Sequence, residues 1–138
     1  MLHAHSALRF LVLGLGSIGL VVFGLGQLQN KPFSKGARVI GSVFAGLTHL
    51  QAVLGLGVVI SGVWYPRLIG HLVMMLAAAV VLQVFLTLNR RKPTPGHLFP
   101  LLGTALALLL MVGGTFAIGR HPFEATVFGS TPAAPSTP

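Results

Sequence analysis

The stretch LIGHLVMMLAAAVVLQVFLTLN, residues 68–89, holds 22 residues without a Lys, Arg, Asp or Glu between Arg67 and Arg90. A helix needs about 20 predominantly apolar residues to cross a bilayer. Three further stretches without these charged residues lie at 10–30, 39–66 and 93–119, and each is at least as long as one crossing requires. The sequence therefore predicts an all-α protein, an integral membrane four-helix bundle with up-down topology.

The composition as a whole fits a bilayer and not water. Only 7% of the 138 residues are charged, whereas a soluble domain carries about a quarter. Hydrophobic residues make up 54% of the chain, the mean hydropathy is +0.88, and Glu124 is the only residue with a carboxylate side chain. Because a soluble protein needs a surface of mixed charges, this composition excludes a soluble globule.

The chain divides into one four-span domain, 1–128, and a tail, 129–138, rich in Pro, Ser and Thr and expected to be disordered. The prolines fall in the connections or in a first helical turn, where a missing N–H costs nothing. The first span lacks the features of a cleavable signal peptide, so it is predicted to be retained. The predicted spans are about 5–26, 39–62, 70–89 and 98–119.

The basic residues predict an orientation and not a nucleic-acid partner. The formal net charge is +8, but the charges lie in short connections between apolar stretches. Six of them fall in the loops 27–38 and 90–97, and three lie toward the other face. The excess of Lys and Arg in cytoplasmic loops therefore predicts that these two loops are cytoplasmic and both termini outside. Lipid is the expected partner, and nucleic acid is not.

Two motifs are interpreted as packing. The sequence GLGSIG at 14–19 matches the dinucleotide-binding pattern G-x-G-x-x-G, but it lies inside an apolar span with no strand before it and no acidic residue about 20 positions after it. Pairs of small residues four apart, such as Gly41/Ala45 and Gly103/Ala107, predict close helix contacts. The chain has no cysteine, which excludes thiol redox chemistry and cysteine metal sites.

Histidines are the side chains best suited to carry chemistry. His49 lies ten residues into its span, about 15 Å from the start of the helix and so near the bilayer centre. Ionisable residues at that depth tend to be functional, although a neutral imidazole bonded to a backbone carbonyl or to Gln51 or Gln83 is the structural alternative. The six histidines are His3, His5, His49, His71, His97 and His121.

His5 and His71 are the best-matched pair of metal ligands. Each opens its span, and the two spans run parallel in an up-down bundle, so the two imidazoles lie at one depth and can hold a haem iron between them. Arg9, four residues after His5, lies on the same helix face and can meet a haem propionate. His3 and His121 are alternative ligands. Met74 and Met75 can act as an axial ligand or fill space, and a zinc site of His3, His5, His71 and His121 ranks below haem.

Three fragments carry a family resemblance: HSALRF at 5–10, HLQ at 49–51 followed by LGL at 54–56, and GHLVMM at 70–75. They resemble a family of small bacterial four-helix membrane proteins that are cytochrome b-like, although Gly70 stands where that family tends to have an acidic residue. The resemblance implies b-type haem held by the histidines of these fragments and a place in the bacterial cytoplasmic (inner) membrane. His5, His49 and His71 are therefore the candidate haem ligands.

The leading functional hypothesis is a membrane haem b protein that transfers single electrons, with His5, His71 and His49 as iron ligand candidates and Arg9 near a propionate. One alternative is an accessory subunit of a larger respiratory or redox membrane complex, or a homo-oligomer, in which the histidines are incidental. Another is a small transporter that relies on His49. No span contains a carboxylate to act as general base, so an electron carrier or subunit is favoured over a stand-alone enzyme.

Overall fold

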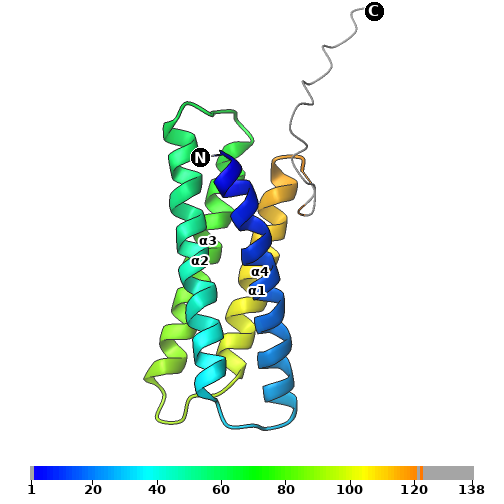
Figure 1. Ribbon diagram of the computed structural model, residues 1–138, viewed down its shortest axis with the longest axis vertical. Helices are drawn as coiled ribbons and strands as arrows, with labels where there is room; N and C mark the ends of the chain where they lie inside the picture. The colour runs from blue at the N-terminus through cyan, green and yellow to red at the C-terminus, as the bar shows by residue number, and fades with distance from the viewer. Residues whose placement is uncertain (1, 121, 123–138) are drawn as a thin grey trace, which may run out of the picture.

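The computed structural model describes residues 2–120 and 122, and these residues form a bundle of four helices (Figure 1). Each helix is long and apolar enough to cross a membrane, as the sequence predicted. The predicted all-α bundle is confirmed. The helices are α1 (Leu2–Leu28), α2 (Lys35–Ile60), α3 (Leu68–Arg91) and α4 (Leu98–Ala117).

The chain runs up and down, so each helix packs against the helices that precede and follow it, and α4 also packs against α1. Helices α1 and α3 therefore lie diagonally across the bundle and run in the same direction. The start of α1 and the connection between α2 and α3 lie at one end, called here the histidine-pair end because His5 and His71 lie there (Figure 1). The opposite end, with the other two connections, is called the basic end.

The helix boundaries follow local backbone chemistry. Helix α2 begins at Lys35 and not at residue 39, because the Ser34 side chain accepts a hydrogen bond from the Ala37 backbone N–H and caps the helix there. It ends at Ile60, shortly before Gly62, whose φ of 97° suits glycine. Basic residues therefore lie within the first turn of α2 and the last turn of α3, beyond the apolar segments of these two helices.

Many large apolar side chains point away from the bundle, as a lipid-facing surface requires. Leu109, Val53 and Ile60 are examples, and every one of the four helices has exposed residues of this kind. With the lengths of the helices, this pattern identifies a multi-pass membrane protein.

The core lies along the middle of the bundle and is completed by close approach at glycines. Phe44, Leu82 and Ala107, from three different helices, are fully buried in one cluster. A Cβ atom on Gly103 would lie 2.6 Å from the Cβ of Phe85, so α3 and α4 approach too closely there for any larger residue. The close helix contact that the Gly103/Ala107 pair predicts is therefore present at Gly103.

Candidate cofactor site at the histidine-pair end

The structure brings His5 of α1 and His71 of α3 together across the diagonal of the bundle. Their ring centroids are 6.4 Å apart, and the ring planes meet at 78°. A metal-bound imidazole nitrogen lies about 2.0–2.1 Å from its metal, so two imidazoles on opposite sides of one metal have ring centres roughly 6 Å apart. The observed separation of the rings is therefore that of a pair able to share one metal.

His71 is held by α4 in the orientation of a metal ligand. Its Nδ1–H donates to the backbone carbonyl of Gly114 at 2.9 Å. Because a carbonyl only accepts, the ring proton is on Nδ1 and the lone pair of Nε2 is left for a ligand. Gly114 makes the contact possible, because a Cβ there would lie 2.6 Å from Met75 Cε and 3.2 Å from Met74 Cβ.

His5 is tied to α2 by Gln51, which is almost completely buried. The Gln51 side-chain amide donates to the His5 backbone carbonyl at 3.0 Å, and the same nitrogen lies 3.3 Å from His5 Nε2. Since an amide nitrogen only donates, Nε2 is the acceptor and Nδ1 carries the proton. His5 Nδ1 and Gln51 Oε1 are both buried, and neither has a hydrogen-bond partner within the described part of the chain.

Two cavities meet at this pair. One, of about 170 Å³, extends toward the end of the bundle, and the other, of about 220 Å³, extends between α2 and α3 toward the exposed side chains of Val53 and Leu76. The residues that line both cavities are His5, Gln51, Gly55, His71, Met75 and Met111. A flat group between the two imidazole rings would occupy both cavities.

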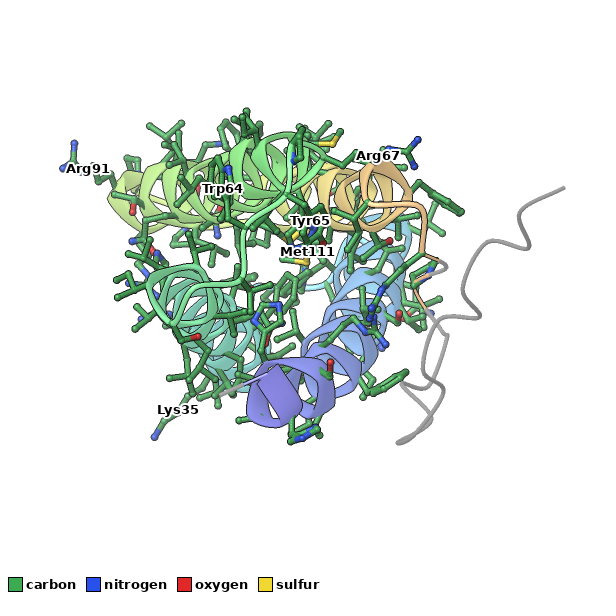
Figure 2. All side chains as sticks on the ribbon, turned by 90° about the horizontal axis from the view of Figure 1, so that it is seen from above. Lys35, Trp64, Tyr65, Arg67, Arg91 and Met111 are labelled. Carbon is green, nitrogen blue, oxygen red and sulfur yellow. The ribbon has the colours of Figure 1, made fainter. Side chains whose placement is uncertain are left out.

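Arginines lie at the end-facing cavity. Arg9 and Arg120 both line it, and Tyr65 reaches it from the connection between α2 and α3. Figure 2 looks down the bundle from this end and shows Tyr65 and Met111 near the middle of the four helices, with Arg67 at the periphery. The Arg9 guanidinium also lies 4.8 Å from the ring centre of Phe10. The predicted position of Arg9 beside His5 therefore places a cation where an acidic substituent of a bound group would lie.

The structure does not bring His49 to the other two candidate ligands. Its side chain is exposed on the outer surface of α2, and its Nδ1–H donates to the backbone carbonyl of Ala45 at 2.6 Å. Thr48 and Gln51 face the interior from the same helix, and His49 lies between them in sequence but on another face. A neutral imidazole bonded to a backbone carbonyl was the alternative to a functional role for His49, and the contact with Ala45 is a bond of that kind.

The remaining candidates are dispersed. His3 is exposed on α1, His97 is buried at the basic end, and His121 lies outside the described residues. Met75 lines both cavities. Between residues 2 and 120, no group of three or more His, Cys, Asp or Glu side chains is placed to hold a metal ion. The site therefore offers two imidazoles, a donor set that suits haem iron better than zinc.

Sequence reasoning missed the residues that shape the site around the histidines. Gln51 was given a role only as a partner of His49. Gly55 appeared only within the LGL fragment of the resemblance, and Gly114 and Met111 were not considered. Spacing contains the signal for α2: positions 44, 48, 51, 55 and 58 follow a 3.5-residue repeat, which identifies one inward face. Gln51 and Gly55 are on that face and His49 is not. No comparable sequence pattern identifies the carbonyl of Gly114 as the partner of His71.

The residues present fit a haem in three respects, and the size of the cavities limits where it can lie. Two imidazoles face each other at a suitable separation, the surroundings are mostly apolar, and arginines lie at one side. Cofactor pockets commonly measure about 300–1,000 Å³, so neither cavity alone is sufficient and a porphyrin would need both. His5 would coordinate through Nε2, its unprotonated nitrogen, once the Gln51 amide turns away from it, or through Nδ1 in the other tautomer, whose Nε2–H could no longer accept from Gln51.

No protein-family model, curated protein or solved structure matches the chain. Functional inference therefore rests on the residues and geometry of the site.

Proposed function

We propose that this protein binds one haem b between His5 and His71 and transfers single electrons within the membrane. The observation that carries the proposal is the pair of imidazoles 6.4 Å apart across the bundle, with His71 fixed by Gly114. Haem in this position supplies one-electron redox chemistry, and its ligands and surroundings set the potential. The resemblance of the fragments around His5 and His71 to cytochrome b-like proteins points to the same chemistry.

The protein's own residues have separate roles in this proposal. His71 presents Nε2 as a ligand, and its Nδ1–H bond to Gly114 increases the basicity of the ring and fixes its tautomer. Gln51 holds the start of α1 against α2 through the His5 carbonyl. The mostly apolar cavity walls exclude water and favour the less charged, reduced state of a bound redox group. Arg9 and Arg120 attract the acidic substituents of the bound group to the end of the bundle.

The orientation and cellular location belong to the same proposal. The connections with Lys31, Lys35 and Arg38 and with Arg90, Arg91 and Lys92 are at one end, which we infer to be the cytoplasmic side of a bacterial inner membrane. The haem would then lie near the opposite face. A redox partner would approach from that face, or within the membrane as part of a larger respiratory or redox complex.

The test is a reduced-minus-oxidised absorbance spectrum of the full chain, purified in detergent after expression with a haem supply. We expect a sharp reduced α-band in the wild type and its loss in His5→Ala and His71→Ala. His49→Ala is the matched control, because the same residue type is removed from a surface position, and it should keep the band. A colourless, folded wild type would overturn the proposal, as would a band lost only in His49→Ala.

A second candidate function, an accessory subunit or homo-oligomer, is favoured by the exposure of His49. An imidazole on the lipid-facing side of a spanning helix is costly, and a partner helix would cover it. Gly46, one turn earlier, has nothing within 4 Å of an added Cβ, so a neighbour can approach closely there. This candidate predicts a colourless wild type whose assembly, measured by cross-linking in membranes, is weakened by His49→Ala.

A further inference from the structure

The basic end carries a group of cations that the cofactor site does not use. Lys35 and Arg38 lie in the first turns of α2, and Arg90 lies at the end of α3. The Arg90 guanidinium donates to the Ser42 hydroxyl at 2.8 Å, and that hydroxyl donates to the Arg38 carbonyl at 2.9 Å. The hydrogen bonds therefore bring Arg90 of α3 against the face of α2 that carries Arg38.

Lys35 and Arg38 line a groove on α2 that continues into the apolar part of the membrane, and Arg90 is held beside it by its hydrogen bond to Ser42. Lys35, Arg38, Val39, Ser42 and Val43 line an open hollow of about 500 Å³. Their spacing of three, four, seven and eight residues places them on one helix face. The charged members are at the basic end, and exposed Val39 and Val43 follow at greater depth. The groove thus has a cationic head and an apolar path below it, the order found in a phospholipid.

Within residues 2–120 the chain supplies no carboxylate to these cations. The sequence contains no Asp or Glu before Glu124, which lies outside the described residues. The hydroxyl of Ser42 satisfies one donor of Arg90 but neutralises no charge. The positive end of the α2 dipole is at the same place, which adds to the attraction for an anion. The charges of Lys35, Arg38 and Arg90 therefore have no carboxylate among residues 2–120 to balance them, and they attract an anion from the surroundings.

We propose that this groove binds an anionic phospholipid, with its phosphate between Arg38 and Arg90 and an acyl chain along Val39 and Val43. Basic pockets between spanning helices are known to hold the head groups of anionic lipids. The acyl-chain path distinguishes a lipid from free phosphate, since the cations alone would serve either. The proposal is independent of haem, and the lipid would help to hold α2 against α3, which meet less extensively than α3 and α4 do.

Native mass spectrometry of the full chain, released from non-ionic detergent, tests the site. Dioleoyl phosphatidylglycerol and dioleoyl phosphatidylcholine are added separately at equal concentration. We expect the anionic phosphatidylglycerol to be retained more strongly than the zwitterionic phosphatidylcholine. Arg38→Gln and Arg90→Gln should each weaken its retention about fivefold, since a basic residue near a membrane contributes about 1 kcal/mol to the binding of anionic lipid.

Arg91→Gln is the matched control, because Arg91 lies beside Arg90 in sequence but points away from the bundle in Figure 2. It should retain the lipid as the wild type does. Four results overturn the proposal: equal retention of both lipids, equal loss in Arg91→Gln and Arg38→Gln, displacement of the lipid by excess inorganic phosphate, or full lipid retention in a folded Arg38→Gln or Arg90→Gln. Circular dichroism melting of each variant shows whether it is folded.

Discussion

The two ends of the bundle differ in how they hold histidine: His97 is buried at the basic end, whereas His5 and His71 are half-buried at the histidine-pair end. At the basic end, His97 is only 5% exposed and its ring lies against Phe33, with centroids 5.1 Å apart, and near Phe23 at 6.4 Å. Gly26 leaves the space for it, since a Cβ there would lie 2.5 Å from the ring. At the histidine-pair end, His5 and His71 border open cavities.

The difference shows that the surroundings of an imidazole, together with its burial, indicate its role. His97 Nε2–H faces the Pro32 carbonyl at 3.4 Å, and aromatic rings occupy the space beside it. Such a ring fills volume and stabilises the fold. His71 has a fixed tautomer and a free Nε2 beside space for a ligand. Removing His97 should therefore change stability, and removing His71 should change binding.

The largest expected effect is on stability, from His97→Ala. We expect the free energy of unfolding in detergent to fall by about 2–4 kcal/mol, because the substitution leaves a cavity between packed rings. His71→Ala, measured without haem, should cost only about 1 kcal/mol, the value of one hydrogen bond. Thermal unfolding followed by circular dichroism gives both values. Equal losses in the two variants would contradict the distinction between the ends.

A smaller loss is expected from Gly103→Ala, which tests whether close packing holds α3 to α4. The added Cβ would lie 2.6 Å from Phe85 Cβ, an atom fixed to the backbone, so the helices must separate. We expect about 1–3 kcal/mol of destabilisation in the same unfolding assay. Gly46→Ala is the control, and with nothing within 4 Å it should gain up to about 1 kcal/mol from helix propensity. Destabilisation of both variants to the same extent would count against the packing interpretation.

These two predictions also show where sequence information ends. The uncharged stretches at 10–30, 39–66, 68–89 and 93–119 are long enough to define four helices because length and polarity alone decide whether a segment spans a bilayer. The matching depth of His5 and His71 followed from the direction of the chain. The chain direction did not show which face of α2 carries His49, since the depth of a residue says nothing about its rotation around the helix axis. The contact of His71 with Gly114 depends on how α3 and α4 pack, which no local pattern records.

Gly55→Ala is expected to affect the cofactor site more than the fold. Its Cβ would lie 3.1 Å from His5 Cε1, so the imidazole must shift by a few tenths of an ångström. We expect a change of less than about 1 kcal/mol in unfolding free energy and a weaker reduced α-band at equal haem supply. A titration of haem into the detergent-solubilised protein measures the change in affinity. An affinity equal to that of the wild type would place the bound group away from His5.

The smallest effect on stability is expected from Gln51→Leu. The substitution removes the hydrogen bond to the His5 carbonyl, but it also removes the buried Oε1 that lacks a partner, so the two effects partly cancel. We expect a net change within about 1 kcal/mol in the unfolding assay. A loss of unfolding free energy as large as that expected for His97→Ala would contradict this expectation. It would show that Gln51 stabilises the fold, as His97 is expected to do at the basic end.

The most direct test of the central claim is an electron paramagnetic resonance spectrum of the oxidised, haem-loaded protein at low temperature. The account predicts a low-spin ferric signal from two imidazole ligands in the wild type and in His49→Ala. It predicts loss of that signal, to high-spin iron or to no haem, in both His5→Ala and His71→Ala. A low-spin signal that persists in either of these two variants would show that His5 and His71 do not hold one iron between them.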